Sequence, residues 1–139
     1  MSDPRRDVIR VLLVEDEPVN RALVRAIIAR ADPATVPEVD LVEAATIADA
    51  RSMLAGGSFD AVLVDVRLPD GSGLDLIGEI REREREVKVI VVSASVLPAE
   101  RASALATGAD GFLAKPFGSA TLMEAVAREI ARAQAGREQ

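Results

Sequence analysis

The chain has 139 residues, a length typical of one domain, and it can bury enough apolar surface to fold without disulfides or a structural metal. It contains no Cys and no His, which excludes disulfide scaffolds, thiol or histidine catalysis, and zinc sites built from those residues. The formal net charge of −6 has the wrong sign for a protein that binds nucleic acid or an anionic membrane surface. Because no apolar run is long enough to cross a bilayer and the N-terminal run does not resemble a signal peptide, we expect a cytoplasmic protein.

Five short apolar segments predict β-strands, and helical patterns lie between them. In chain order the predicted strands are residues 8–14, 38–44, 60–66, 87–93 and 111–114. The predicted helices are residues 18–31, 47–54, 73–86, 98–107 and 119–135. Thr46, Ser72 and Ser119 stand where helix N-caps belong, and glycines at 56, 57 and 108 stand where helices should end. The last helix carries Leu122, Val126 and Ile130 at steps of four, which is an amphipathic pattern.

The strict alternation of strand and helix predicts an α/β fold, a doubly wound parallel sheet with helices on both faces. The second strand carries three acidic residues and is therefore expected at an edge, with the first and third strands side by side. We expect a single domain over residues 1–139, with its core over 8–133 and a frayed tail over 134–139. The alternating charges of residues 81–86 predict a solvated helix face with i,i+4 pairing.

Polar residues stand at the carboxyl ends of four predicted strands. The first strand is followed by the acidic residues Glu15, Asp16 and Glu17, and the third strand contains Asp65. The fourth strand ends at Ser93, and the fifth strand is followed by Lys115. Ligands of open doubly wound sheets bind outside the carboxyl ends of the strands, where the strand order reverses. We therefore expect Glu15, Asp16 and Asp65 to meet in one crevice.

Such a group of carboxylates implies a cation or a proton, because unpaired like charges repel at close range. Oxygen ligands with water in the shell suit Mg²⁺ or Mn²⁺, held by carboxylates together with phosphate oxygens. The compact charge of Lys115 suits a phosphoryl oxygen, and the hydroxyl of Ser93 could donate to the same oxygen. The residues thus predict a site where a carboxylate meets a phosphate over a metal ion.

Each of these residues also has a simpler interpretation when it is taken alone. Asp65 could cap the loop that follows it, and the acids before Pro18 could stabilise a helix dipole. Ser93 could be an ordinary loop hydroxyl, Lys115 a surface lysine and Phe112 a core aromatic. Their joint occurrence at strand ends favours a single functional site.

Four motifs carry a resemblance to a known family. They are VLLVEDEP at 11–18, VLVDVRLPDGSGLDL at 62–76, VIVVSAS at 89–95 and GADGFLAKPF at 108–117. Together they resemble the receiver domain of bacterial response regulators, over nearly the whole chain. The resemblance implies a flavodoxin-like sheet of five parallel strands in the order 2-1-3-4-5 with five helices.

The resemblance also implies a role for each site residue. Asp65 would be the phosphoacceptor, and Mg²⁺ would be held by Asp16, Asp65 and the backbone carbonyl of Arg67, with Glu15 acting through water. Ser93 and Lys115 would contact the phosphoryl group, and Ser93 and Phe112 would form the switch. A cis peptide bond would precede Pro116. Arg67 and Ser95, which flank the expected path of an attacking water, would tune the lifetime of the phosphoryl group.

The implied partners are a sensor histidine kinase or a histidine phosphotransfer protein, and an unknown downstream protein. The downstream protein would bind the surface formed by the fourth helix, fifth strand and fifth helix. We expect a monomer or a phosphorylation-dependent dimer, with no enzymatic turnover of an external substrate.

One alternative is that the chain is a receiver module excised from a hybrid kinase or a longer regulator. A haloacid-dehalogenase-type phosphatase is a distant alternative, since it needs a carboxylate where Arg67 stands. Nucleotide binding is less supported still, because the chain has no phosphate-binding loop motif.

Overall fold

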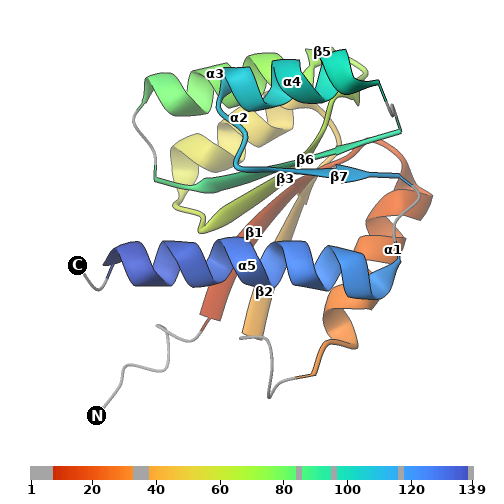
Figure 1. Ribbon diagram of the computed structural model, residues 1–139, viewed down its shortest axis with the longest axis vertical. Helices are drawn as coiled ribbons and strands as arrows, with labels where there is room; N and C mark the ends of the chain where they lie inside the picture. The colour runs from red at the N-terminus through yellow and green to blue at the C-terminus, as the bar shows by residue number, and fades with distance from the viewer. Residues whose placement is uncertain (1–7, 33–37, 84–85, 95–96, 116–117, 138–139) are drawn as a thin grey trace.

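A sheet of five parallel strands forms the centre of the molecule (Figure 1). The structure is a computed structural model, and it describes residues 8–32, 38–83, 86–94, 97–115 and 118–137. The strands are β1 (Val8–Val14), β2 (Glu38–Ala44), β3 (Ala61–Asp65), β6 (Lys88–Ser93) and β7 (Gly111–Ala114). They lie in the order β2-β1-β3-β6-β7, which confirms the predicted order, with the acidic second strand at an edge.

Helices cover both faces of the sheet (Figure 1). They are α1 (Pro18–Ala29), α2 (Ile47–Gly56), α3 (Gly73–Glu82), α4 (Pro98–Thr107) and α5 (Ser119–Arg137). Figure 1 shows α1 and α5 on one face, and α2, α3 and α4 on the other. None of the helices in the described ranges is both long and apolar enough to cross a membrane.

Each face of the sheet has its own apolar core, because side chains alternate between the two faces along a strand. On β1, Leu12 and Val14 belong to the core under α2 and α3, whereas Val11 and Leu13 belong to the core under α1 and α5. All four of these side chains are buried. Two covered faces explain why the central strands are almost continuous runs of Val, Leu and Ile.

The predicted bounds are confirmed for β1, β2, β7 and α4, whereas β3 is one residue shorter than predicted at each end and β6 begins one residue later than predicted. The prediction for α3 was too long, because the helix ends at Glu82 rather than at 86.

The start of the charged run over residues 81–86 is also not a solvated helix face. The guanidinium of Arg81 donates to the carbonyls of Gly108 (2.8 Å) and Val87 (2.9 Å) and to Asp110 (2.6 Å). At the other end of the chain, residues 134–137, which we expected to fray, continue α5.

A small hairpin, which the sequence did not predict, follows β3. Its two strands are β4 (Arg67–Leu68) and β5 (Gly71–Ser72), and they pair in antiparallel fashion. The turn between them carries Asp70, whose carboxylate accepts hydrogen bonds from the amides of Ile47 (2.9 Å) and Ala48 (3.0 Å) at the start of α2. Thr46 is the predicted N-cap of the same helix and accepts from the amide of Asp49. The hairpin is thus fastened to the first turn of α2.

Candidate functional site

An open cleft of about 620 Å³ lies at the carboxyl end of the sheet. Loops that follow β1, β3, β6 and β7 supply most of its lining, as the strand-end rule predicts. The lining residues are Asp16, Glu17, Asn20, Asp65, Arg67, Ser93, Ala94, Leu97 and Lys115. Glu15 is almost fully buried directly behind this cleft, where it borders a second small cavity together with Asp65 and Lys115.

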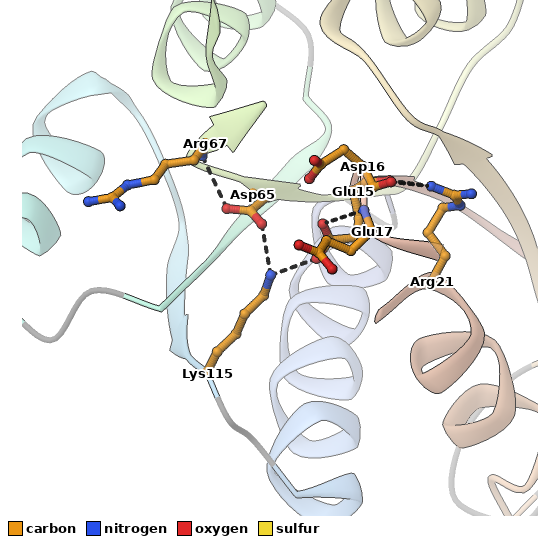
Figure 2. Close-up of polar contacts among 7 residues, drawn as sticks. All are labelled: Glu15, Asp16, Glu17, Arg21, Asp65, Arg67 and Lys115. Atoms are coloured by element: carbon orange, nitrogen blue, oxygen red, sulfur yellow. Dashed lines mark hydrogen bonds and ion pairs between the residues drawn. The ribbon is translucent and has the colours of Figure 1, made fainter. Parts of the chain in front are cut away.

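Lys115 joins two of the carboxylates at the site (Figure 2). Its ammonium nitrogen lies 2.6 Å from Oε1 of Glu15 and 2.7 Å from Oδ2 of Asp65. The backbone amide of Lys115 donates to the carbonyl of Ser93 (2.8 Å), so the lysine is held at the end of β7 by its neighbour β6. Residues 15, 65 and 115, which are far apart in the chain, therefore meet at one point as predicted.

Burial and charge act against each other at these groups. Burial raises the pKa of the Glu15 carboxyl above its ordinary value, although hydrogen bonds from Lys115 and from the Glu17 amide act to lower it. Burial also acts to lower the pKa of Lys115, but its hydrogen bonds with Asp65 and Glu15 outweigh this effect and the pKa is raised. Lys115 is therefore held in its charged form at neutral pH, balancing the carboxylates that face it.

The backbone around Asp65 is closely packed. The amide of Arg67 donates to Oδ1 of Asp65 (3.1 Å), while the other carboxylate oxygen faces Lys115. A Cβ on Gly73 would overlap the carbonyl oxygen of Asp65, so only glycine allows α3 to begin this close to the acid. The amide of Gly73 donates to the carbonyl of Val66 (2.8 Å), which closes the hairpin beneath the site.

Of the two predicted switch residues, Ser93 lines the cleft and Phe112 packs against the core. Ser93 ends β6, is 3% exposed and lines the cleft. Phe112 lies on β7, half-buried against the apolar core under α2, α3 and α4. The guanidinium carbon of Arg101, on α4, lies 5.8 Å from the centre of the Phe112 ring. Ser95 and Pro116, for which we predicted roles, lie outside the described residues.

Two residues at the site were missed in the sequence. Asn20, on α1, lines the cleft beside Asp16. Arg21, the next residue, donates from Nη1 to the backbone carbonyls of Glu15 (3.0 Å) and Asp16 (2.9 Å). The available signal was the helical spacing, since Arg21 is four residues after Glu17 and so points back at the loop before α1.

The acidic group fits a small divalent cation. One carboxylate oxygen from each of Glu15, Asp16 and Asp65 can be chosen so that all three lie within 4.8 Å of one another. This set contains only oxygen ligands, and two of its three members are partly exposed, which leaves room for water. Such a set suits Mg²⁺ better than a transition metal that prefers nitrogen or sulfur.

Comparison with known proteins identifies the family. The response regulator receiver domain family matches residues 11–127, and the chain belongs to this family. The two-component response regulator ORR41 of Oryza sativa subsp. japonica is 37% identical over 112 residues, which cover 81% of this chain and 87% of that protein. The response regulator protein PilR of Pseudomonas aeruginosa is 37% identical over 121 residues, 87% of this chain but only 26% of PilR. The chain thus spans about a quarter of one such relative and most of another.

Solved structures support the same assignment. The receiver domain of the sensor histidine kinase PA1611 from Pseudomonas aeruginosa PAO1 matches with a TM-score of 0.73 and 30% identity, over 88% of this chain and 98% of that one. That structure has a magnesium ion coordinated in its active site cleft. The protein is therefore a receiver domain of the two-component signalling class, and the acidic cleft stands at the carboxyl edge of its sheet.

Proposed function

We propose that Asp65 accepts a phosphoryl group from a phosphohistidine of a sensor histidine kinase or a histidine phosphotransfer protein. A carboxylate oxygen of Asp65 attacks phosphorus, the bond from phosphorus to the imidazole nitrogen breaks, and an acyl phosphate forms. The observation that carries this proposal is the contact of Lys115 with both Asp65 and Glu15 at the edge of an open cleft. Asp65 lines that cleft, which gives a partner's phosphohistidine a way to approach it.

The residues around Asp65 would bind the cation and the phosphoryl oxygens. Glu15, Asp16 and Asp65, with the backbone carbonyl of Arg67, would hold Mg²⁺, and Mn²⁺ offers the same coordination chemistry. The bound ion supplies positive charge that offsets the charge of the incoming phosphoryl oxygens. Lys115 leaves one of its carboxylate partners to take a phosphoryl oxygen, and the hydroxyl of Ser93 donates to another.

The new acyl phosphate carries about −1.5 to −2 charges where the Asp65 carboxylate carried −1, so the cleft becomes more negative. Ser93 moves toward the phosphoryl group, and Phe112 turns into the space that this movement opens. The surface of α4, β7 and α5 then changes shape for a downstream protein. Phe112 is suited to such a movement because it is only half-buried at the edge of the apolar core, and its ring also meets the exposed Arg101.

Two residues tune how long the phosphoryl group lasts in this proposal. Arg67 lines the cleft and is exposed, and its side chain extends away from Asp65 (Figure 2), so a rotation of this side chain toward the acid would change the access of water. Ser95 is assigned the same role from its sequence position alone, two residues after Ser93. The rates of autodephosphorylation of Arg67→Ala and Ser95→Ala test this role, and rates equal to that of the unaltered protein would exclude it.

We further propose that residues 1–139 act as one receiver domain in the cytoplasm, signalling by protein contact, as a monomer or as a dimer formed on phosphorylation. The same module could serve within a hybrid kinase or a longer regulator. A phosphatase of the haloacid dehalogenase type is disfavoured, because the position two residues after Asp65 holds Arg67 instead of a carboxylate that could act as a general acid.

The test is labelling with a small phosphodonor such as acetyl phosphate, with and without Mg²⁺, followed by mapping of the labelled residue. We expect Mg²⁺-dependent label on Asp65 and no label on Asp65→Asn. Asp70→Asn is the matched control, because it removes a nearby acid that faces the start of α2 instead of the cleft, and it should still be labelled. Label that persists on Asp65→Asn, or sustained turnover of a phosphate monoester, would refute the assignment.

A further inference from the structure

The backbone of the acidic loop after β1 is held by one guanidinium group. Nη1 of Arg21 donates to the carbonyl oxygen of Glu15 at 3.0 Å and to that of Asp16 at 2.9 Å. Figure 2 shows the Arg21 side chain reaching back from α1 to this loop. The charged donor strengthens both hydrogen bonds relative to neutral ones.

These two carbonyls belong to the two peptide planes on either side of the Cα of Asp16. Because a peptide unit is planar, fixing both carbonyls fixes the backbone dihedral angles of Asp16 and hence the direction of its Cβ. Glu15 has further support, since its carboxylate is bound by Lys115 and by the Glu17 amide. No group in the described part of the chain is seen to donate to the carboxylate of Asp16, so the backbone alone aims it.

Arg21 is itself held in place by the edge strand of the sheet. Its Nε lies 3.6 Å from Oε1 of Glu43 on β2. Glu43 in turn receives two hydrogen bonds from Arg25, at 2.9 and 2.7 Å, which fix the orientation of its carboxylate. The side chain of Arg21 is 22% exposed, against 58% for that of Arg25. The guanidinium of Arg21 is therefore a packed part of the site's support.

We propose that Arg21 is a positioning residue that aims Asp16 at the cation site, an inference that rests on the proposed function. Two roles of Arg21 predict opposite effects on cation binding. As a positive charge near the acids, Arg21 weakens the binding of Mg²⁺, so its removal should tighten binding. As a support for the loop, it strengthens binding, so its removal should weaken it.

The test is a titration of the full chain with Mg²⁺. Binding is measured by calorimetry or by the shifts of the amide NMR resonances of residues 15–17. We expect Arg21→Gln to bind Mg²⁺ about tenfold more weakly than the unaltered protein, as supporting residues of metal sites do. Affinity that is unchanged or tighter overturns the proposal. In the metal-free protein, the same variant should show conformational exchange at the amides of Asp16 and Glu17, and its absence also counts against the proposal.

The matched control is Arg25→Gln. It removes the same charge from the same helix and also loses a contact with Glu43, but Arg25 donates to neither carbonyl of the acidic loop and affects that loop only by way of Glu43 and Arg21. Its Mg²⁺ affinity should stay within twofold, and an equal loss in both variants would overturn the assignment to Arg21. If Arg21→Gln does not fold, Arg21→Lys replaces it: this variant keeps the charge but has one nitrogen in place of the Nη1 that binds the carbonyls and the Nε that faces Glu43, and it should also lose affinity.

The outcomes distinguish a failure of the role of Arg21 from a failure of the proposed function. If the unaltered protein binds no Mg²⁺, the proposed function fails. If the unaltered protein and Arg21→Gln bind Mg²⁺ equally well, only the role of Arg21 fails.

Discussion

The two ends of the sheet both gather charged side chains, but they arrange them differently. At the amino end, Arg81 from α3 donates to the carbonyls of Gly108 and Val87 and to Oδ2 of Asp110. The same oxygen of Asp110 accepts from the amide of Val89 (2.8 Å). At the carboxyl end, three carboxylates form a single group, and one lysine contacts two of them.

The difference separates a structural cluster from a functional one. The amino-end cluster pairs one cation with one anion, and both also bind the backbone of neighbouring elements, so it joins α3, α4 and β6. The carboxyl-end cluster has an excess of negative charge, which costs stability unless something positive arrives. A cluster whose positive and negative charges do not balance marks a place where a ligand is expected.

The largest effect that we predict comes from the amino end. Arg81→Ala removes donors from two carbonyls and leaves Asp110 without its cation in a half-buried place. We expect a loss of about 3 kcal/mol in the free energy of unfolding. Removing the cation of a partly buried ion pair leaves the carboxylate desolvated without a compensating charge. Urea denaturation measures this loss, and the Mg²⁺ affinity should not change.

Arg51→Ala is the matched control for that variant. Arg51 also binds a carboxylate through two hydrogen bonds, joining α2 to α3 through Glu79 at 2.9 and 2.6 Å, but its side chain is 55% exposed. Exposed pairs contribute little, so the loss should be much smaller than for Arg81→Ala. Equal losses would mean that burial and backbone contacts do not distinguish the two pairs.

The same contrast explains what could be predicted from the sequence. The strands were predictable because an element buried on both faces must be continuously apolar, and the convergence of Asp16, Asp65 and Lys115 followed from the rule about strand ends. The role of Arg81 was not, because i,i+4 spacing offered a local partner, whereas two of its three actual partners lie 27 and 29 residues away. Arg21 was missed because it binds backbone carbonyls, which every residue possesses and no sequence motif marks.

A second prediction concerns the excess charge at the carboxyl end. Asp16→Asn removes one of three mutually repelling carboxylates without removing a partner of Lys115. In the absence of divalent cations we expect the variant to be more stable by about 1 kcal/mol, the size of one partly screened charge repulsion at this range. Urea denaturation in the presence of a chelator measures the gain.

The sign should reverse when Mg²⁺ is added. The unaltered protein gains stability from binding in proportion to the logarithm of the cation concentration, and Asp16→Asn gains less. Glu17→Gln is the control, because Glu17 is exposed in the same loop but does not belong to the acidic group. A stability order that Mg²⁺ leaves unchanged would argue against cation binding at Asp16.

The smallest predicted effect is at the hairpin that follows Asp65, at the carboxyl end of β3. Hydrogen bonds from the amides of Ile47 and Ala48 hold the pKa of the Asp70 carboxyl below its ordinary value of 3.8. A group with a lowered pKa in the folded state contributes stability above its unfolded pKa, and that contribution disappears as the pH falls through the folded pKa. The unaltered protein should therefore melt at a higher temperature than Asp70→Asn at neutral pH.

That difference in melting temperature should shrink as the pH falls below about 4, because a protonated Asp70, like asparagine, carries no charge to attract the α2 amides. Asp49→Asn is the control, since it removes an exposed acid from the first turn of α2 without touching the hairpin. A difference for Asp70→Asn that is the same at every pH would show that the side chain acts by shape alone. Its disappearance in acid would show that charge fastens the hairpin to α2, and so ties the backbone after Asp65 to the rest of the fold.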